Sequence, residues 1–154
     1  MTREIIGFAM VMLVFLIASL VAIGYRNKSR AETLATPPLA EATDCNGVEC
    51  MYVSTVYAET PLKRLLAHGM GPRGKATVAV NDDGISVCRQ GEQNYLIPRA
   101  EIRGVGKSSA TIDRAVEPGG LVSITWNHQG REFITNLRFS DSQSRQIFER
   151  KVIA

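Results

Sequence analysis

Hydrophobic positions are distributed along this chain in three distinct patterns, and the first is a continuous block near the N-terminus. Residues 5–24 (IIGFAMVMLVFLIASLVAIG) contain no charged side chain. Twenty helical residues are about 30 Å long, which matches the hydrocarbon core of a bilayer. We therefore predict a transmembrane helix over about residues 5–24, within an N-terminal anchor of residues 1–30. A cleaved signal peptide is the alternative, since Ala22-Ile23-Gly24 is a passable cleavage site.

The second pattern is a polar stretch without apolar periodicity. Residues 31–50 are rich in Ala, Thr, Pro and Glu, with Pro37-Pro38 near the middle. Such a composition cannot bury enough apolar surface to order itself. We expect a mobile, extended tether between the anchor and a folded domain of residues 51–154.

The third pattern is the short-period alternation of β-strands, separated by Gly, Asn, Asp and Pro turn signals. Between the first two strands, Thr60-Pro61 resembles a helix start, and the spacing of the leucines that follow predicts a short helix ending at Gly69. The strands are expected at residues 51–57, 76–80, 85–89, 95–97, 102–105, 110–112, 121–126 and 132–139.

The chain returns to a helical pattern at its end. Ser140 and Gln143 have the spacing of a capping box, which predicts a helix over 141–152. Phe148 and Val152 are four residues apart, with Ile147 adjacent, so these three side chains are expected to face the domain. Phe148 should fill one open end of the sheet.

These elements define a mainly β fold: an N-terminal transmembrane helix followed by a small antiparallel β-barrel or sandwich that a C-terminal helix closes. The segments ATVAVNDDGISVCRQGEQNYLIPRAEIRGVG and TIDRAVEPGGLVSITWNHQGREFITNLRF resemble the pleckstrin-homology-like (PH-like) domain of small actinobacterial single-pass membrane proteins. The resemblance is close over about residues 72–139, and the order of span, linker and domain covers the whole chain. It implies the fold and layout, and no catalytic residue, because those proteins are largely uncharacterised.

The three cysteines bear on the compartment. Cys45 and Cys50 could close a small disulfide loop in an oxidising compartment, or remain reduced thiols in the cytoplasm. Two cysteines without a second pair or a nearby histidine make a poor zinc site. Cys88 lies in an alternating strand and is expected to be a small buried side chain.

Two segments are candidate binding sites. The run 61–81 contains no acidic residue and carries Lys63, Arg64, Arg73 and Lys75, which could bind an anionic lipid headgroup or form an ordinary solvated face. The long polar loop of residues 113–120 is a second candidate, because loops of this kind often contact partners. Its candidate contact residues are Arg114, Glu117, Pro118, Gly119 and Gly120.

Composition and motifs exclude several functions. The 154 residues suffice for one domain and an appendage. The chain lacks hydrolase, P-loop, zinc-protease and dinucleotide-binding signatures, so we expect no enzyme, no cofactor and no metal. Its basic residues are not interleaved with exposed aromatics, which argues against nucleic acid as a partner. The single tryptophan, Trp126, fits a core position.

Flanking charge predicts the orientation in the cell membrane. Arg26, Lys28 and Arg30 follow the span, whereas Arg3 alone precedes it. Basic residues stay on the cytoplasmic side, which favours a cytoplasmic C-terminal domain. The leading hypothesis is thus a non-catalytic, membrane-anchored adaptor for another membrane or envelope protein. The alternatives are a module that binds anionic lipid headgroups and an extracytoplasmic envelope protein with a Cys45–Cys50 disulfide.

Overall fold

A single long helix precedes the domain. In the computed structural model, which describes residues 2–108 and 121–153, α1 (Thr2–Ala35) is 34 residues long. At 1.5 Å per residue it extends about 50 Å, well beyond the thickness of a hydrocarbon core. The apolar side chains of its first two-thirds are exposed, and Glu4–Ala35 has the length and hydropathy of a membrane span. These features are consistent with the predicted anchor.

The helix ends later than the predicted boundary at residue 30. The segment after the span, YRNKSRAETLA, consists largely of good helix formers and contains neither Gly nor Pro. Pro37 is the first residue that cannot continue the helix, and it also disfavours helical geometry at Thr36. The last eleven residues of α1 therefore form a helical stalk, Tyr25–Ala35, between the span and the domain.

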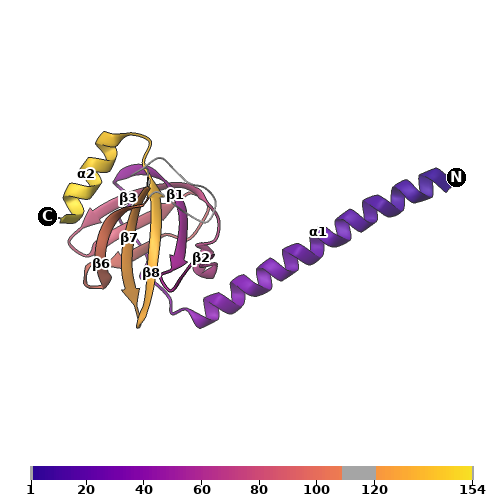
Figure 1. The fold of residues 1–154 in the computed structure, drawn as a ribbon, viewed down its shortest axis with the longest axis horizontal. Helices are drawn as coiled ribbons and strands as arrows, with labels where there is room; N and C mark the ends of the chain where they lie inside the picture. The colour runs from indigo at the N-terminus through magenta and orange to yellow at the C-terminus, as the bar shows by residue number, and fades with distance from the viewer. Residues whose placement is uncertain (1, 109–120, 154) are drawn as a thin grey trace.

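The domain is one strongly bent antiparallel sheet, drawn in Figure 1 with α1 projecting from one side. The strand order is β5-β4-β3-β1-β8-β7-β6, and β2 pairs with β1 outside this path. The bounds are β1 Val48–Tyr57, β2 Thr60–Arg64, β3 Gly74–Asn81, β4 Gly84–Arg89, β5 Tyr95–Pro98, β6 Ile102–Ser108, β7 Leu121–His128 and β8 Arg131–Arg138.

Strand β1 joins the two halves of the sheet. Its residues Val48–Tyr52 pair with β3, and Met51–Tyr57 pair with β8, with a bulge between Tyr52 and Ser54. A bulge bends a strand and increases its twist, which lets ten residues serve both halves. The mainly β fold is confirmed. The sheet is not closed, because its terminal strands β5 and β6 do not pair with each other over the residues that the structure describes.

The prediction of a short helix after Thr60 is wrong. Thr60–Arg64 is strand β2, which pairs with the end of β1, and the Leu65 amide donates to the Thr55 carbonyl at 2.8 Å. The backbone then turns through the one-turn 3-10 helix η1 (Ala67–Gly69). His68 and Gly69 have φ values of 50° and 73°, which no α-helix accommodates. A second such turn, η2 (Arg99–Glu101), connects β5 to β6.

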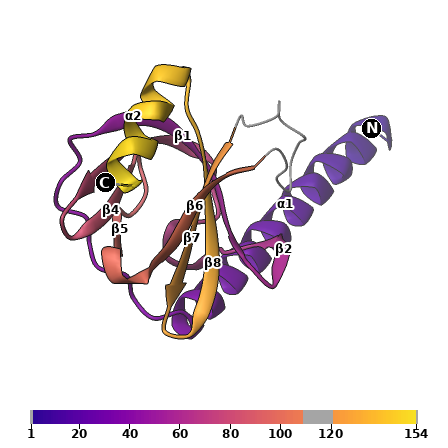
Figure 2. The ribbon, with the colours of Figure 1, turned by 60° about the vertical axis from the view of Figure 1, so that its left-hand side comes forward.

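The C-terminal helix α2 (Ser142–Ile153) packs against β1 and β3, on the flank of the domain away from α1 (Figure 2). Its N-cap is Asp141 rather than Ser140, because the Asp141 carboxylate accepts the Ser144 amide at 2.7 Å. Phe148 is fully buried, with its ring 5.3 Å from that of Phe139. Ile147 is 43% exposed, so its predicted inward position is wrong.

The core lies between the bent sheet and α2. Its largest members include Trp126, Tyr52, Phe133 and Phe148, and the predicted core position of Trp126 is confirmed. Gly84 shows how tightly the strands pack: a side chain there would meet the Ile97 carbonyl of β5, and the residue has a φ of 147°. Only glycine fits this combination of close approach and left-handed backbone.

Candidate functional site

The first candidate site is the junction between the stalk and the domain. We define the junction loop as residues 65–71, which contain η1. Ser29 donates to the Leu66 carbonyl at 3.0 Å, and the Leu66 amide donates to the Glu32 carboxylate at 2.7 Å. Two contacts of His68 extend the junction toward the end of α1: its amide donates to the Thr33 hydroxyl, and its Nε2 lies 3.0 Å from the Thr36 carbonyl oxygen. The stalk and the domain are thus hydrogen-bonded to each other.

The junction loop also reaches the membrane end of the stalk. A Cβ at Gly71 would lie 2.6 Å from the hydroxyl oxygen of Tyr25, so glycine permits this approach. Tyr25 is the first residue after the predicted span, where an aromatic ring with a polar tip suits the bilayer interface. The domain surface around Gly71 therefore lies at the level at which the helix leaves the apolar span.

A buried arginine holds the junction loop from inside the domain. Arg89, at the end of β4, is 6% exposed and donates to the Gly69 carbonyl at 2.6 Å and to the Pro72 carbonyl. Its guanidinium lies 4.0 Å from the ring centroid of Tyr52, whose hydroxyl donates to the Met70 carbonyl at 2.8 Å. Burial raises the pKa of Tyr52 well above its ordinary value, so this hydroxyl keeps its proton. Sequence reasoning missed Arg89, because an arginine before a Gln-Gly turn resembles an ordinary surface residue.

The segment between α1 and β1 is ordered rather than a free tether. Ala40 bridges the edge strand β5 at Leu96, and Thr36 and Ala42 are buried. Cys45 forms a disulfide with Cys88 on β4. This segment, residues 36–47, therefore lies against the β4–β5 side of the sheet. The prediction of a mobile tether is wrong. The composition of the segment does not favour order, but pairing with the edge strand β5 and the disulfide hold it in place.

The disulfide differs from both alternatives that the sequence left open, a Cys45–Cys50 bond and reduced thiols. Cys50 belongs to the core as a free, buried thiol, and the alternative bond between Cys45 and Cys50 does not form. The reason is that Cys50 is already part of β1, paired with Ala76, whereas Cys45 precedes the strand. Burial raises the pKa of the Cys50 thiol to about 12, so it stays protonated at neutral pH.

A prediction about thiols and stability follows from this pairing. Peptide mapping of the unreduced protein should find Cys45 linked to Cys88, and a maleimide should modify Cys50 only after denaturation. The bond spans 43 residues, and restricting a loop of that length stabilises a fold by about 4 kcal/mol in the chain-entropy treatment. The double variant Cys45→Ser, Cys88→Ser should therefore melt well below the parent. A Cys45–Cys50 peptide, or a native-state reaction at Cys50, would contradict the structure.

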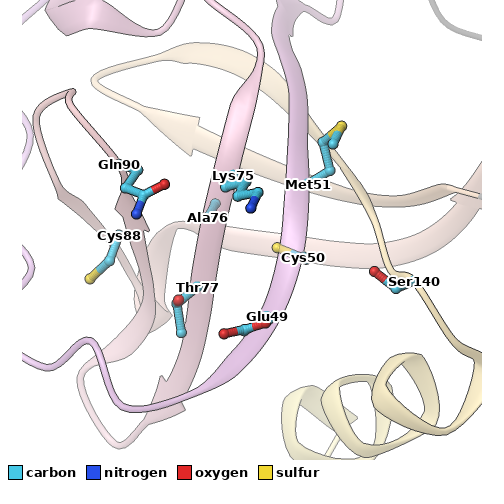
Figure 3. Close-up of a pocket in the computed structure, with 9 residues that line it drawn as sticks. All are labelled: Glu49, Cys50, Met51, Lys75, Ala76, Thr77, Cys88, Gln90 and Ser140. Atoms are coloured by element: carbon cyan, nitrogen blue, oxygen red, sulfur yellow. The ribbon is translucent and has the colours of Figure 1, made fainter.

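The second candidate site is a hollow on the outer face of the sheet, shown in Figure 3. It has a volume of about 440 Å³, and a smaller hollow of about 270 Å³ adjoins it around Met51 and Ser140. Figure 3 shows side chains of β1, β3 and β4 around the larger hollow, with Ser140 at the side nearest α2. Its lining residues are Glu49, Cys50, Met51, Lys75, Ala76, Thr77, Cys88, Gln90 and Ser140.

The four predicted basic residues do not form one patch. Lys63 lies on β2 with its ammonium 4.9 Å from the ring centroid of Tyr57, and Arg64 donates to the Gly71 carbonyl in the junction loop. Arg73 and Lys75 instead lie beside the hollows on the outer face. The structure therefore divides the set between the junction and the outer-face hollows.

The other candidate residues give no further site. Arg114, Glu117, Pro118, Gly119 and Gly120, together with the strand expected at 110–112, lie outside the described residues. In the part of the chain that the structure describes, no group of three metal-ligating side chains occurs. An imidazole–carboxylate pair joins His128 Nδ1 to Glu101 at 3.0 Å, but it lies apart from both candidate sites, between η2 and the end of β7.

Comparison with known proteins identifies the fold class. A family model described as bacterial PH domain-like matches residues 30–152, so the chain belongs to that family. The match begins within the stalk and includes the segment before β1, in agreement with their contacts with the domain. No curated protein matches the chain significantly. The predicted PH-like domain is therefore confirmed, whereas an actinobacterial source remains a prediction.

Proposed function

We propose that this chain is a non-catalytic adaptor whose single membrane helix holds its PH-like domain in a fixed position at the membrane surface. The observation that carries the proposal is the hydrogen-bonded junction between the stalk and residues 65–71. A domain on a free tether samples many orientations, whereas a docked domain presents one face to its neighbours in the bilayer. Pre-orientation of this kind lowers the entropic cost of binding another membrane protein.

An exposed apolar side chain near the junction suits a protein partner. Leu62 on β2 is 82% exposed, although an isolated exposed leucine is common on protein surfaces. A photo-crosslinking amino acid at Leu62 in the full chain in membranes tests the adaptor role, with Gln129 in the β7–β8 turn as a matched exposed position. A discrete protein adduct from Leu62 and none from Gln129 supports the adaptor. Adducts with lipid alone favour the lipid-binding alternative.

We also propose that the domain lies on the extracytoplasmic side. The Cys45–Cys88 disulfide supports this orientation, because the cytosol keeps most thiols reduced. The flanking charges favour the opposite orientation, but their bias is only three basic residues against one. A disulfide that connects the segment before β1 to β4 is a stronger constraint on the compartment than this small difference in charge.

Reporter fusions after Ala154 test the orientation. Alkaline phosphatase, which requires an oxidising compartment, should be active there, and a green fluorescent protein that folds only in the cytoplasm should stay dark. In intact cells, Cys45 and Cys88 should be protected from maleimide until a reductant is added. A fluorescent fusion with freely reactive thiols at both positions would place the domain in the cytoplasm.

A further inference from the structure

The outer face of the sheet carries a row of side chains that the sequence does not place together. In the pairing of β3, β1 and β8, Met51 lies directly opposite Lys75 on one side and Arg138 on the other. Direct partners in an antiparallel sheet point to the same face. Arg73 adds a third cation, because its Nε lies 3.1 Å from the Met51 sulfur. Three basic side chains from β3, β8 and the loop before β3 thus surround one methionine.

These cations lack acidic partners within the described part of the chain. Arg73, Lys75 and Arg138 are all exposed, and the side chains of Lys75 and Arg138 make no hydrogen bond or ion pair there. Three like charges gathered on one face repel one another, which makes an anion at this position favourable. Arg73 is also two residues from Gly71, which approaches Tyr25 at the end of the span, so an anion here would lie close to the bilayer surface.

The hollows beside the cations define the space and the polar groups that are open to a ligand. The smaller hollow contains Arg73, Arg138 and Ser140, which can donate hydrogen bonds to a phosphate group. The larger one continues from Lys75 to Thr77, Gln90 and Glu49 (Figure 3). Glu49 lies two residues from Met51 along β1, about 7 Å away. Its carboxylate can accept hydrogen bonds from hydroxyl groups, as can the Gln90 amide oxygen.

We propose that these joined hollows bind a phosphorylated polyol, with its phosphate on Arg73, Lys75 and Arg138 and its hydroxyl groups on Glu49, Thr77 and Gln90. A bare anion would not use the larger hollow, and a neutral sugar would leave the three cations without an anionic partner. The volume of about 440 Å³ lies in the range of small-molecule sites. The ligand can be a free sugar phosphate or the headgroup of a lipid, since both present the same chemistry. The site does not depend on the adaptor role or on the orientation of the domain.

Isothermal titration of the full chain in phosphatidylcholine nanodiscs tests the site, with glucose 1-phosphate, glucose and inorganic phosphate as probes. Glucose 1-phosphate should bind more tightly than either fragment, and its affinity should fall as salt rises. Arg138→Gln and Lys75→Gln should each weaken it by about tenfold or more, because each removes a charge-assisted contact. Arg131→Gln is the matched control: it removes an exposed arginine from the other end of β8 and should leave the affinity unchanged.

A second arm identifies the source of the ligand. Nanodiscs that contain phosphatidylinositol should compete with glucose 1-phosphate if the headgroup occupies the site, and should not compete if the ligand is free in solution. Either result supports the site when Arg138→Gln and Lys75→Gln each weaken binding of glucose 1-phosphate by about tenfold or more and Arg131→Gln leaves it unchanged. The proposal would be overturned if the chain bound neither glucose 1-phosphate nor phosphatidylinositol. An equal loss of affinity in all three variants would also overturn it. The Leu62 crosslinks would remain informative in that case, so failure here is distinct from failure of the adaptor role.

Discussion

Replacing Phe148 with alanine should lower the free energy of unfolding by about 3–5 kcal/mol. The side chain is fully buried, stacks on Phe139 and connects α2 to the sheet. A domain of this size has only about 5–15 kcal/mol of stability, so the variant should melt far below the parent and could lose its fold. Thermal melts of the full chain in detergent, followed by near-ultraviolet circular dichroism, measure the change.

The neighbouring Ile147 supplies the control. It is 43% exposed, so Ile147→Ala should lower the free energy of unfolding by less than about 1 kcal/mol. The sequence pattern alone expects both side chains in the core, and hence a large loss from both variants. An unchanged melt for Phe148→Ala would show that α2 is a detached element and not part of the core.

Replacing Arg89 with methionine should release the junction loop. The substitution leaves the carbonyl groups of Gly69 and Pro72 without this donor and removes the stack on Tyr52. Both hydrogen bonds are part-buried and come from a charged donor, which makes each worth about 1.5–3 kcal/mol. The expected loss is therefore about 3 kcal/mol, offset in part because a buried charge is also removed. Hydrogen exchange gives a more specific readout: the amides of Leu66 and His68, which donate to the stalk, should lose protection.

Arg103→Met is the control for this variant. Arg103 is exposed on β6, and its replacement should change neither the melt nor the exchange of the junction amides. If Arg89→Met left the Leu66 and His68 amides as protected as in the parent, Arg89 would not be the residue that holds the junction loop.

Local patterns predict the parts of the fold that depend on neighbouring residues. The apolar block of residues 5–24 lies within α1, and the alternation of β-branched residues indicates seven of the eight strands in the described part of the chain. Phe148 and Trp126 are expected in the core because each occurs at the apolar positions of a regular pattern, and both are buried there. These features need no information about distant segments.

The features that sequence reasoning missed depend on distant segments. Thr60–Arg64 has the start signals of a helix, but the free end of β1 offers backbone partners that make it a strand. Cys45 bonds to Cys88 across 43 residues, since the sheet brings β4 beside the segment before β1. Arg138 joins Arg73 and Lys75 only because β8 pairs with β1 at Met51. The acid-free run 61–81 indicates part of this basic cluster and contains no sign of Arg138.

The central claim is that the PH-like domain is docked on the stalk rather than tethered to it. Double electron–electron resonance between spin labels at Arg30 on the stalk and Glu59 beside β2 tests this claim in the full chain in nanodiscs. Labels attached through a keto amino acid leave the disulfide intact. A docked domain predicts one narrow distance distribution, which should broaden in Arg89→Met. A broad distribution in the parent chain, as a flexible linker produces, would contradict the docked arrangement.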